Sequence, residues 1–423
     1  MSEAFISVDP TPTDWRDPAM QTRIRRRYAA ERRFRLIGLG AVLLSAGFLA
    51  FLLISMAMNG LNGFRQTELR LDVDLRQSGA ALTAAQLAGP DAEQALAEVD
   101  FEGIMRRTAD AQYGPRGARL FSPAGRLVLR EAVKADPGLL TRPATLWLPA
   151  ESGIDQAAKG HGTAEADARY RPLAEAGRAR IGFNTNFLTG ADATDPTAVG
   201  IWGAFKGSLL TMIITLLIAF PVGVLSAVYL EEYAPRNRWT DMIEVSINNL
   251  AAVPSIIFGL LGLAVFLQVM HLPRSAPIVG GLTLALMTMP VIVIAGRNAI
   301  KSVPPSIRDA ALGIGASRIQ VVFHHVIPLA LPGILTGTII GMARALGETA
   351  PLLMIGMRAV IASPPGGLAE PATALPVQIF LWSDDVSRGF VEKTSAAIIV
   401  LLVFLLAMNG LAIYLRNRFE KRW

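Results

Sequence analysis

The chain has 423 residues, of which 52% are hydrophobic and 17% charged, and its mean hydropathy is +0.41. It contains no cysteine, which excludes disulfides and thiolate metal sites, and its four histidines show no metal-ligand spacing. The isoelectric point near 9.8 does not indicate nucleic-acid binding, because the arginine clusters flank apolar blocks and are not interleaved with aromatic residues. Long apolar blocks are instead typical of a membrane protein.

Six apolar segments are long enough, or nearly so, to cross a bilayer as helices of about 20 residues. They are Leu36–Met58, Gly207–Leu230, Val253–Met270, Ile278–Ile300, Leu329–Met357 and Ala396–Leu415. Seven arginines between positions 23 and 35 precede the first segment, so we predict a retained anchor with residues 1–35 in the cytoplasm. Six crossings return the C-terminus to the same side. Its basic residues are Arg416, Arg418, Lys421 and Arg422.

Residues 59–200 separate the first span (36–58) from the remaining five (201–423) and are too polar to lie in the membrane. We predict that they form an extracytoplasmic α+β insertion. The expected strands are Leu69–Leu75, Arg119–Leu129 and Ala144–Leu148, and the expected helices are Ala92–Ala111 and Thr163–Ala176. No catalytic motif occurs there, which favours a packing or docking domain over a sensor.

The loop at 303–328 contains the most informative motif. Pro305 suits the first turn of a helix, where its missing N–H has no cost. Three residues are expected on the short helix that follows: Asp309, Ala310 and Ala311. Glycines at 313 and 315 end or turn this helix, and a second amphipathic stretch leads to Pro328 and the fifth span. Small residues on an exposed helix allow it to enter a narrow groove on a partner.

The fifth predicted span contains three glycines spaced four residues apart, followed by two charged residues. The glycines are Gly333, Gly337 and Gly341. They share one helix face, where another helix can approach closely. Arg344 and Glu348 continue on that face at helical spacing, so we expect both to face protein or a water-filled cavity rather than lipid.

Arg344 would lie roughly 20 Å beyond the start of this span, which is too deep for a residue that only anchors a helix end. An ionisable residue inside a span costs at least about 2.5–3.5 kcal/mol and is therefore a functional candidate. Its guanidinium suits a phosphate-like oxyanion. The alternative is a purely structural Arg344–Glu348 pair. Arg297, near the cytoplasmic end of the fourth span, is either an ordinary positive-inside residue or a second pathway residue.

The 303–328 loop resembles the EAA loop of bacterial ABC importer permeases. In that pattern Asp309-Ala310-Ala311 stands for E-A-A, Gly315 has the right spacing, and Ile327-Pro328 stands for the final L-P. Asp replaces Glu, and His325 occupies a position where the family has Ile. In the family this loop forms coupling helices that dock into the ATPase subunit. A generic amphipathic connector is the alternative.

Three further stretches resemble the PstA family of membrane subunits of phosphate ABC importers, over about residues 181–423. They are Ala252–Gly262, Arg344–Leu352 (R-A-L-G-E-T-A-P-L) and Ala374–Phe380. The resemblance implies an all-α polytopic fold with six transmembrane helices and a MetI-like permease core. It also implies roles in transport for Arg297 and Arg344. The implied partners are a second permease subunit (PstC-like), a cytoplasmic ATPase dimer (PstB-like) and a periplasmic phosphate-binding protein (PstS-like).

The family resemblance further implies a multi-pass protein of the bacterial inner membrane that works by alternating access. No G-x-x-x-x-G-K-[ST] run exists in the chain, so we expect no enzymatic activity and no cofactor of its own, with ATP bound by the partner ATPase. Other readings stay open. A permease for sulfate, molybdate or phosphonate would use the same cationic side chain, whereas a signalling or scaffold protein would use residues 59–200 as an external sensor. A simple channel conflicts with the docking loop.

Overall fold

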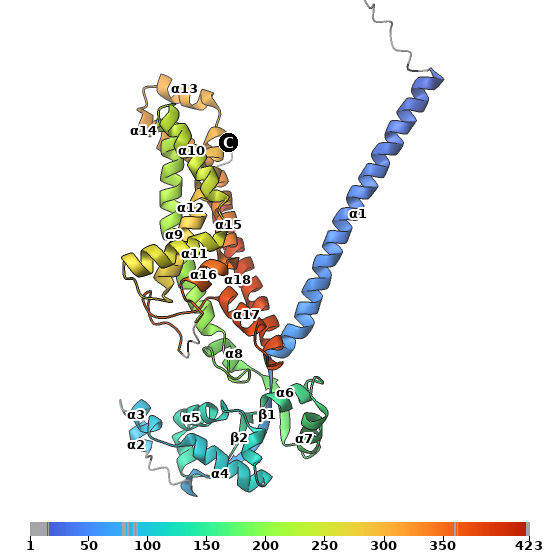
Figure 1. Cartoon of the computed structure of the whole chain (residues 1–423), viewed down its shortest axis with the longest axis vertical. Helices are drawn as coiled ribbons and strands as arrows, with labels where there is room; N and C mark the ends of the chain where they lie inside the picture. The colour runs from blue at the N-terminus through green and yellow to red at the C-terminus, as the bar shows by residue number, and fades with distance from the viewer. Residues whose placement is uncertain are drawn as a thin grey trace, which may run out of the picture. The chain divides into compact units, whose positions relative to one another are not determined.

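The computed structural model describes residues 15, 17–77, 82, 84–87, 89, 92–358, 361 and 363–419. It is mostly helical and separates into two compact units, residues 1–56 and 57–423 (Figure 1). Helix α1 (Pro18–Gly63) has 46 residues and contains the first predicted span. Of the basic C-terminal residues, Arg416 and Arg418 lie in the last turn of the final helix, whereas Lys421 and Arg422 lie outside the described residues.

The polar insertion folds around a three-stranded antiparallel sheet. Its strands are β1 (Arg65–Val73), β2 (Ala144–Pro149) and β3 (Ala179–Phe183), in the order β2-β1-β3. The helices are α2 (Ala84–Leu87), α3 (Ala92–Ala97), α4 (Phe101–Tyr113), α5 (Gly125–Ala135), α6 (Ser152–Ala158), α7 (Ala164–Glu175) and α8 (Thr185–Thr189). Alternate residues of β1 (Leu69, Leu71 and Val73) point into a core shared with Leu129 and Val133 of α5.

The expected strands near Leu69–Leu75 and Ala144–Leu148 are confirmed, as is the helix at Thr163–Ala176, where Thr163 caps α7. The prediction of a strand at Arg119–Leu129 is wrong. Most of that stretch belongs to a 3-10 turn and to α5, because Leu129 and Val133, four residues apart, are buried on one helical face. The expected helix at Ala92–Ala111 is two helices, with Asp100 capping the second.

The remaining elements are α9 (Trp202–Val228), α10 (Arg238–Ala251), α11 (Ser255–Gly262), α12 (Pro277–Lys301), α13 (Pro305–Gly313), α14 (Arg318–Gln320), α15 (Ile327–Gly347), α16 (Ala350–Met354), α17 (Leu375–Ser383) and α18 (Gly389–Phe419). π-Helical turns extend α9 (Tyr229–Tyr233), α11 (Leu263–Val269) and the start of α15 (Val321–Val326).

Five helices among the described residues are long and apolar enough to cross a membrane, or six if one bent pair forms a single span. That pair consists of α10 and α11 with its extension, which meet at 100°. The third predicted span, Val253–Met270, corresponds to α11 and its extension (Ser255–Val269), which passes as a membrane span only together with α10. Pro254 lies at the bend, where it supplies no N–H to continue α10.

The predicted glycine face is confirmed, and the helix that approaches it is α12. A Cβ atom at Gly337 would lie 2.1 Å from the Ala295 Cβ, and one at Gly333 would lie 2.7 Å from the Ala299 Cβ. At Gly341 the nearest atom would be the Thr288 Cγ2, at 2.9 Å. These three glycines therefore let α15 pack directly on α12.

The predicted fifth span, Leu329–Met357, is wrong at its C-terminal end. Helix α15 stops at Gly347, and Glu348 leaves the helical conformation with φ −77° and ψ 123°. Pro351 explains the break, because a proline ring in a continuing helix would collide with the carbonyl group four residues earlier. Arg344 consequently lies in the last turn of α15, not in the middle of a longer helix.

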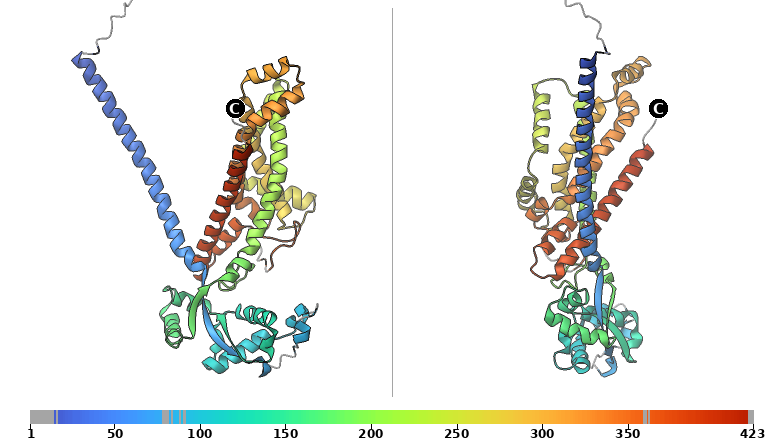
Figure 2. Two further views of the ribbon diagram at one scale, coloured as in Figure 1. Left: turned by 180° about the vertical axis from the view of Figure 1, so that it is seen from behind. Right: turned by 90° about the vertical axis from the view of Figure 1, so that its right-hand side faces the viewer.

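Four buried charged residues join the insertion to the start of α18, and we call them the junction network: Asp155, Lys159, Glu392 and Lys393. The Lys159 Nζ lies 2.7 Å from the Asp155 carboxylate and 3.0 Å from that of Glu392. Lys393 donates to the Gly63 carbonyl oxygen at 2.9 Å. Figure 2 shows the start of α18 beside the insertion.

Candidate functional site

The 303–328 loop has the structure that its sequence predicted. Pro305 occupies the first turn of α13, and Gly315 adopts a φ of +87°, a left-handed conformation that turns the chain toward α14. Ser317 and Gln320 then cap each other's backbone at the start of α14. Helix α13 is thus a separate helix, with its start defined by Pro305 and its end by the turn at Gly315.

Within α13 the predicted docking residues have two different environments. Asp309 and Ala310 are exposed, whereas Ala311 is 4% exposed and packs on Val321 and Val326. Ala311 is therefore buried within the loop, and its predicted role in docking stays a prediction. The exposed surface continues through large apolar side chains that the sequence did not single out: Leu312, Ile314, Ile319 and Phe323. An exposed apolar surface of this kind is typical of an interaction site.

Arg308 fastens α13 to the preceding helices. Its guanidinium bonds the Glu232 carboxylate at 2.7 Å and donates to the carbonyl oxygens of Val303 and Ile300 at 2.7 and 3.0 Å. Glu232 belongs to the π-helical turn after α9, and Ile300 belongs to α12. A displacement of α13 would therefore act directly on the ends of α9 and α12.

Arg297 is buried and bonded to two carboxylates. Its Nε donates to Glu231 after α9, and an Nη lies 2.7 Å from the Glu244 carboxylate of α10. Lys301 lies 3.5 Å from Glu231 as well. Arg297 thus joins three helices, and its predicted role in the anion pathway stays a prediction.

Arg344 lies in the last turn of α15, three residues beyond Gly341. Its side chain is 48% exposed, and its Nε lies 3.3 Å from the Glu348 carboxylate, a distance at the long end of a hydrogen bond. Glu348 is more buried, with 18% of its side chain exposed. The predicted pair therefore forms even though the helix ends between the two residues. The guanidinium keeps its remaining N–H groups on an accessible surface.

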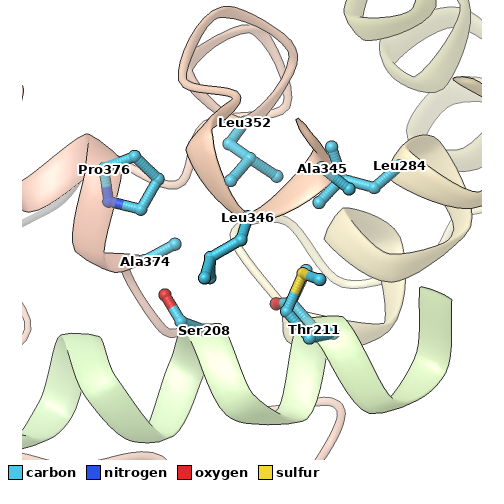
Figure 3. A pocket seen from close by; sticks show the side chains of 9 residues that line it. Ser208, Thr211, Leu284, Ala345, Leu346, Leu352, Ala374 and Pro376 are labelled. Atoms are coloured by element: carbon cyan, nitrogen blue, oxygen red, sulfur yellow. The ribbon is translucent and has the colours of Figure 1, made fainter. Parts of the chain in front are cut away.

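A small cavity is lined in part by Ala345 and Leu346, the two residues that follow Arg344 in sequence (Figure 3). Its lining comes from α9, α12, α15, α16 and the start of α17 and includes Ser208, Thr211, Ala345 and Leu346. The Ser208 Oγ accepts a hydrogen bond from the Leu375 N–H at 2.7 Å, and the Thr211 Oγ1 is buried without a hydrogen-bond partner. About 10 Å³ of free volume holds one water at most. An oxyanion does not fit into this volume.

Sequence reasoning missed three carboxylates, those of Glu231, Glu232 and Glu244, which bond Arg297 and Arg308. Their distance from those arginines along the chain, 66 residues for Glu231 and Arg297, gives no local pattern. The only available signal was composition. Glu231 and Glu232 directly follow the predicted span Gly207–Leu230. The positive-inside rule predicts Lys and Arg at this cytoplasmic end, so two adjacent acidic residues there are unusual.

Comparisons with known proteins show the family to which the chain belongs. The family described as binding-protein-dependent transport system inner membrane component matches residues 219–422, and a domain of unknown function, DUF3333, matches residues 21–168. The phosphate transport system permease protein PstA of Haemophilus influenzae is 31% identical over 211 residues, covering 50% of this chain and 73% of that protein. The chain therefore belongs to the family of binding-protein-dependent transport system inner membrane components, as a PstA-type permease.

Other relatives share smaller parts. The probable ABC transporter permease protein YqgI of Bacillus subtilis is 38% identical over 40% of this chain and 56% of its own length, so the chain spans little more than half of it. An inward-facing structure of the MetNI methionine ABC transporter is 17% identical, with a TM-score of 0.40, over 52% of this chain and 95% of that one. The family match confirms the MetI-like permease core and a multi-pass inner-membrane protein.

Proposed function

We propose that the chain is the permease subunit of an ATP-driven inorganic phosphate importer. The observation that supports this most directly is the accessible guanidinium of Arg344 at the C-terminal end of α15. The N-terminal end of the same helix continues from the α13–α14 loop. The PstA relative of Haemophilus influenzae is a phosphate transport permease by name. Helix α15 thus connects the loop that we propose contacts the ATPase with the Arg344 side chain that we propose binds the anion.

Arg344 and Glu348 would act on the anion together. A guanidinium presents a planar set of donors that matches two phosphate oxygens and stays charged at every physiological pH. A single bond of 3.3 Å to Glu348 leaves most of those donors free. Hydrogen phosphate also has an O–H donor, which the Glu348 carboxylate could accept. Sulfate and molybdate lack that donor at neutral pH, so Glu348 would favour phosphate over them.

Force from ATP binding would enter through α13. Asp309, Ala310 and the apolar side chains beyond them form the surface that would contact an ATPase dimer (PstB-like), and Arg308 would pass the movement to α9 and α12. Arg297, bonded to Glu231 and Glu244, would keep three helix ends together during that movement. ATP hydrolysis would occur on the partner, and this chain would have no enzymatic activity and no cofactor.

The proposed assembly adds a second permease subunit (PstC-like) and a periplasmic phosphate-binding protein (PstS-like). With the bent pair counted as one span, six spans put both termini and α13 in the cytoplasm and the insertion in the periplasm. Arginines before the first span and at the end of α18 support this orientation.

The test is phosphate uptake by the assembled transporter carrying Arg344→Gln, with Arg274→Gln as the matched control. Arg274 is an exposed arginine in the loop before α12. We expect Arg344→Gln to reduce uptake at least about tenfold, as loss of a charged hydrogen-bonding group does, while ATPase binding persists. Wild-type uptake by Arg344→Gln would remove Arg344 from the pathway. Equal losses in both variants would show a general charge effect.

A further inference from the structure

A laterally open apolar cleft lies between α9, α15 and α18 and has a volume of about 360 Å³. Its lining residues are Leu216, Leu217, Phe220, Pro221, Leu335, Thr338, Ile339, Met342, Met408, Asn409, Ala412 and Leu415. All three helices are long and apolar enough to cross a membrane. The walls of the cleft are therefore three candidate membrane spans.

The cleft walls offer almost no hydrogen bonds to an occupant. The Thr338 hydroxyl donates to the Ile334 carbonyl oxygen of its own helix at 2.9 Å. Among the described lining residues, the Asn409 Oδ1 is the buried side-chain polar atom left without a partner, and it is an acceptor only. Flexible Met342 and Met408 side chains suit an occupant of variable shape.

A positive charge lies at one end of this cleft. Arg416 directly follows the lining residue Leu415, and its Nη1 lies 3.4 Å from the Thr336 Oγ1, next to the lining residue Leu335. In the part of the chain that the structure describes, Arg416 forms no ion pair with a carboxylate and otherwise bonds the neutral Asn417 side chain. Three more basic residues follow in sequence, at 418, 421 and 422. Basic clusters at a helix end attract anionic lipid headgroups.

We propose that this cleft binds an acyl chain of an anionic phospholipid whose phosphate contacts Arg416. The chain would fill the space between α9, α15 and α18, and the headgroup would neutralise the guanidinium at the end of α18. This site is separate from Arg344 and does not depend on which anion the permease transports. It would stabilise α18 against α15, the helix that continues from the docking loop.

The experiment uses the full chain in nanodiscs of phosphatidylcholine that contain a minor fraction of phosphatidylglycerol with a photoreactive acyl chain. We expect the label to attach to residues of the cleft. Arg416→Gln should reduce labelling about fivefold, the effect of one arginine near the lipid surface. Ala412→Trp should abolish it by filling the cleft. Val403→Trp is the matched control, because Val403 is on the same helix and 60% exposed, outside the cleft lining.

Four results would overturn the proposal. Photoreactive phosphatidylcholine could label the cleft as strongly as phosphatidylglycerol, which would remove the role of charge. Labelling could persist in Ala412→Trp, which would place the lipid elsewhere. The cleft could also be protected in the assembled transporter, which would show that a helix of a partner covers it. Excess inorganic phosphate present before irradiation should not reduce labelling. A reduction would mean that Arg416 binds free anions.

Discussion

Replacing Lys159 of the junction network by methionine tests how strongly the insertion is attached to the membrane helices. The Lys159 side chain is 2% exposed, and its ammonium bonds both Asp155 and Glu392. Lys159→Met keeps most of the side-chain length but leaves two buried carboxylates without the ammonium that bonds both of them, and with Lys393 as the remaining cation of the network. Removing one partner of a buried ion pair typically costs about 3–5 kcal/mol, which corresponds to a fall in Tm of roughly 10 °C.

The matched control is Lys134→Met, because Lys134 also bonds a carboxylate, that of Glu93, but is 44% exposed. An exposed pair contributes about 0–1 kcal/mol, so this variant should hardly change Tm. Thermal unfolding of the purified full chain measures the Tm of each variant. Limited proteolysis between the insertion and α18 measures how firmly these two parts are attached. Adding Glu392→Leu to Lys159→Met should restore part of the loss. If Lys159→Met lowered Tm no more than Lys134→Met, the junction network would not hold these parts together.

Three further outcomes follow from the packing, the docking surface and one buried carboxyl. Gly337→Ala should lower stability by about 1–3 kcal/mol, because its Cβ would lie 2.1 Å from that of Ala295, whereas Gly410→Ala, with open space around it, should be neutral in the same thermal assay. Ala310→Trp should reduce ATPase binding in a pull-down without changing Tm; unchanged binding would contradict the docking surface. Burial raises the pKa of the Asp192 carboxyl group above its value in the unfolded chain. The stability that this group contributes is therefore present below about pH 4 and is lost as the pH rises through the raised pKa. Asp192→Asn should flatten the dependence of Tm on pH in that range, and an unchanged slope would contradict this.

The fold of the 303–328 loop could be predicted from the sequence because its determinants are local. Pro305 starts a helix and Gly315 turns the chain, and both effects depend only on backbone geometry. The glycine face of α15 was equally readable, since a spacing of four residues defines one side of a helix. The break after Gly347 was also encoded, in Pro351, but an apolar run that continues to Met357 concealed it.

The orientation of single side chains could not be predicted in the same way. Ala310 and Ala311 are adjacent and identical in type, and only the packing of Val321 and Val326 shows which one is buried. The same holds for Arg297 and Arg344. Both are arginines within predicted spans, but long-range contacts with Glu231 and Glu244 make the first an internal connection and leave the second accessible.

Uptake of radiolabelled phosphate by proteoliposomes containing the assembled transporter tests the central claim most directly. The account predicts that uptake requires ATP on the side of α13 and is lost in Arg344→Gln. Excess sulfate or molybdate should inhibit phosphate uptake only weakly. Phosphate uptake without ATP, or uptake that sulfate or molybdate abolishes as effectively as unlabelled phosphate does, would contradict it.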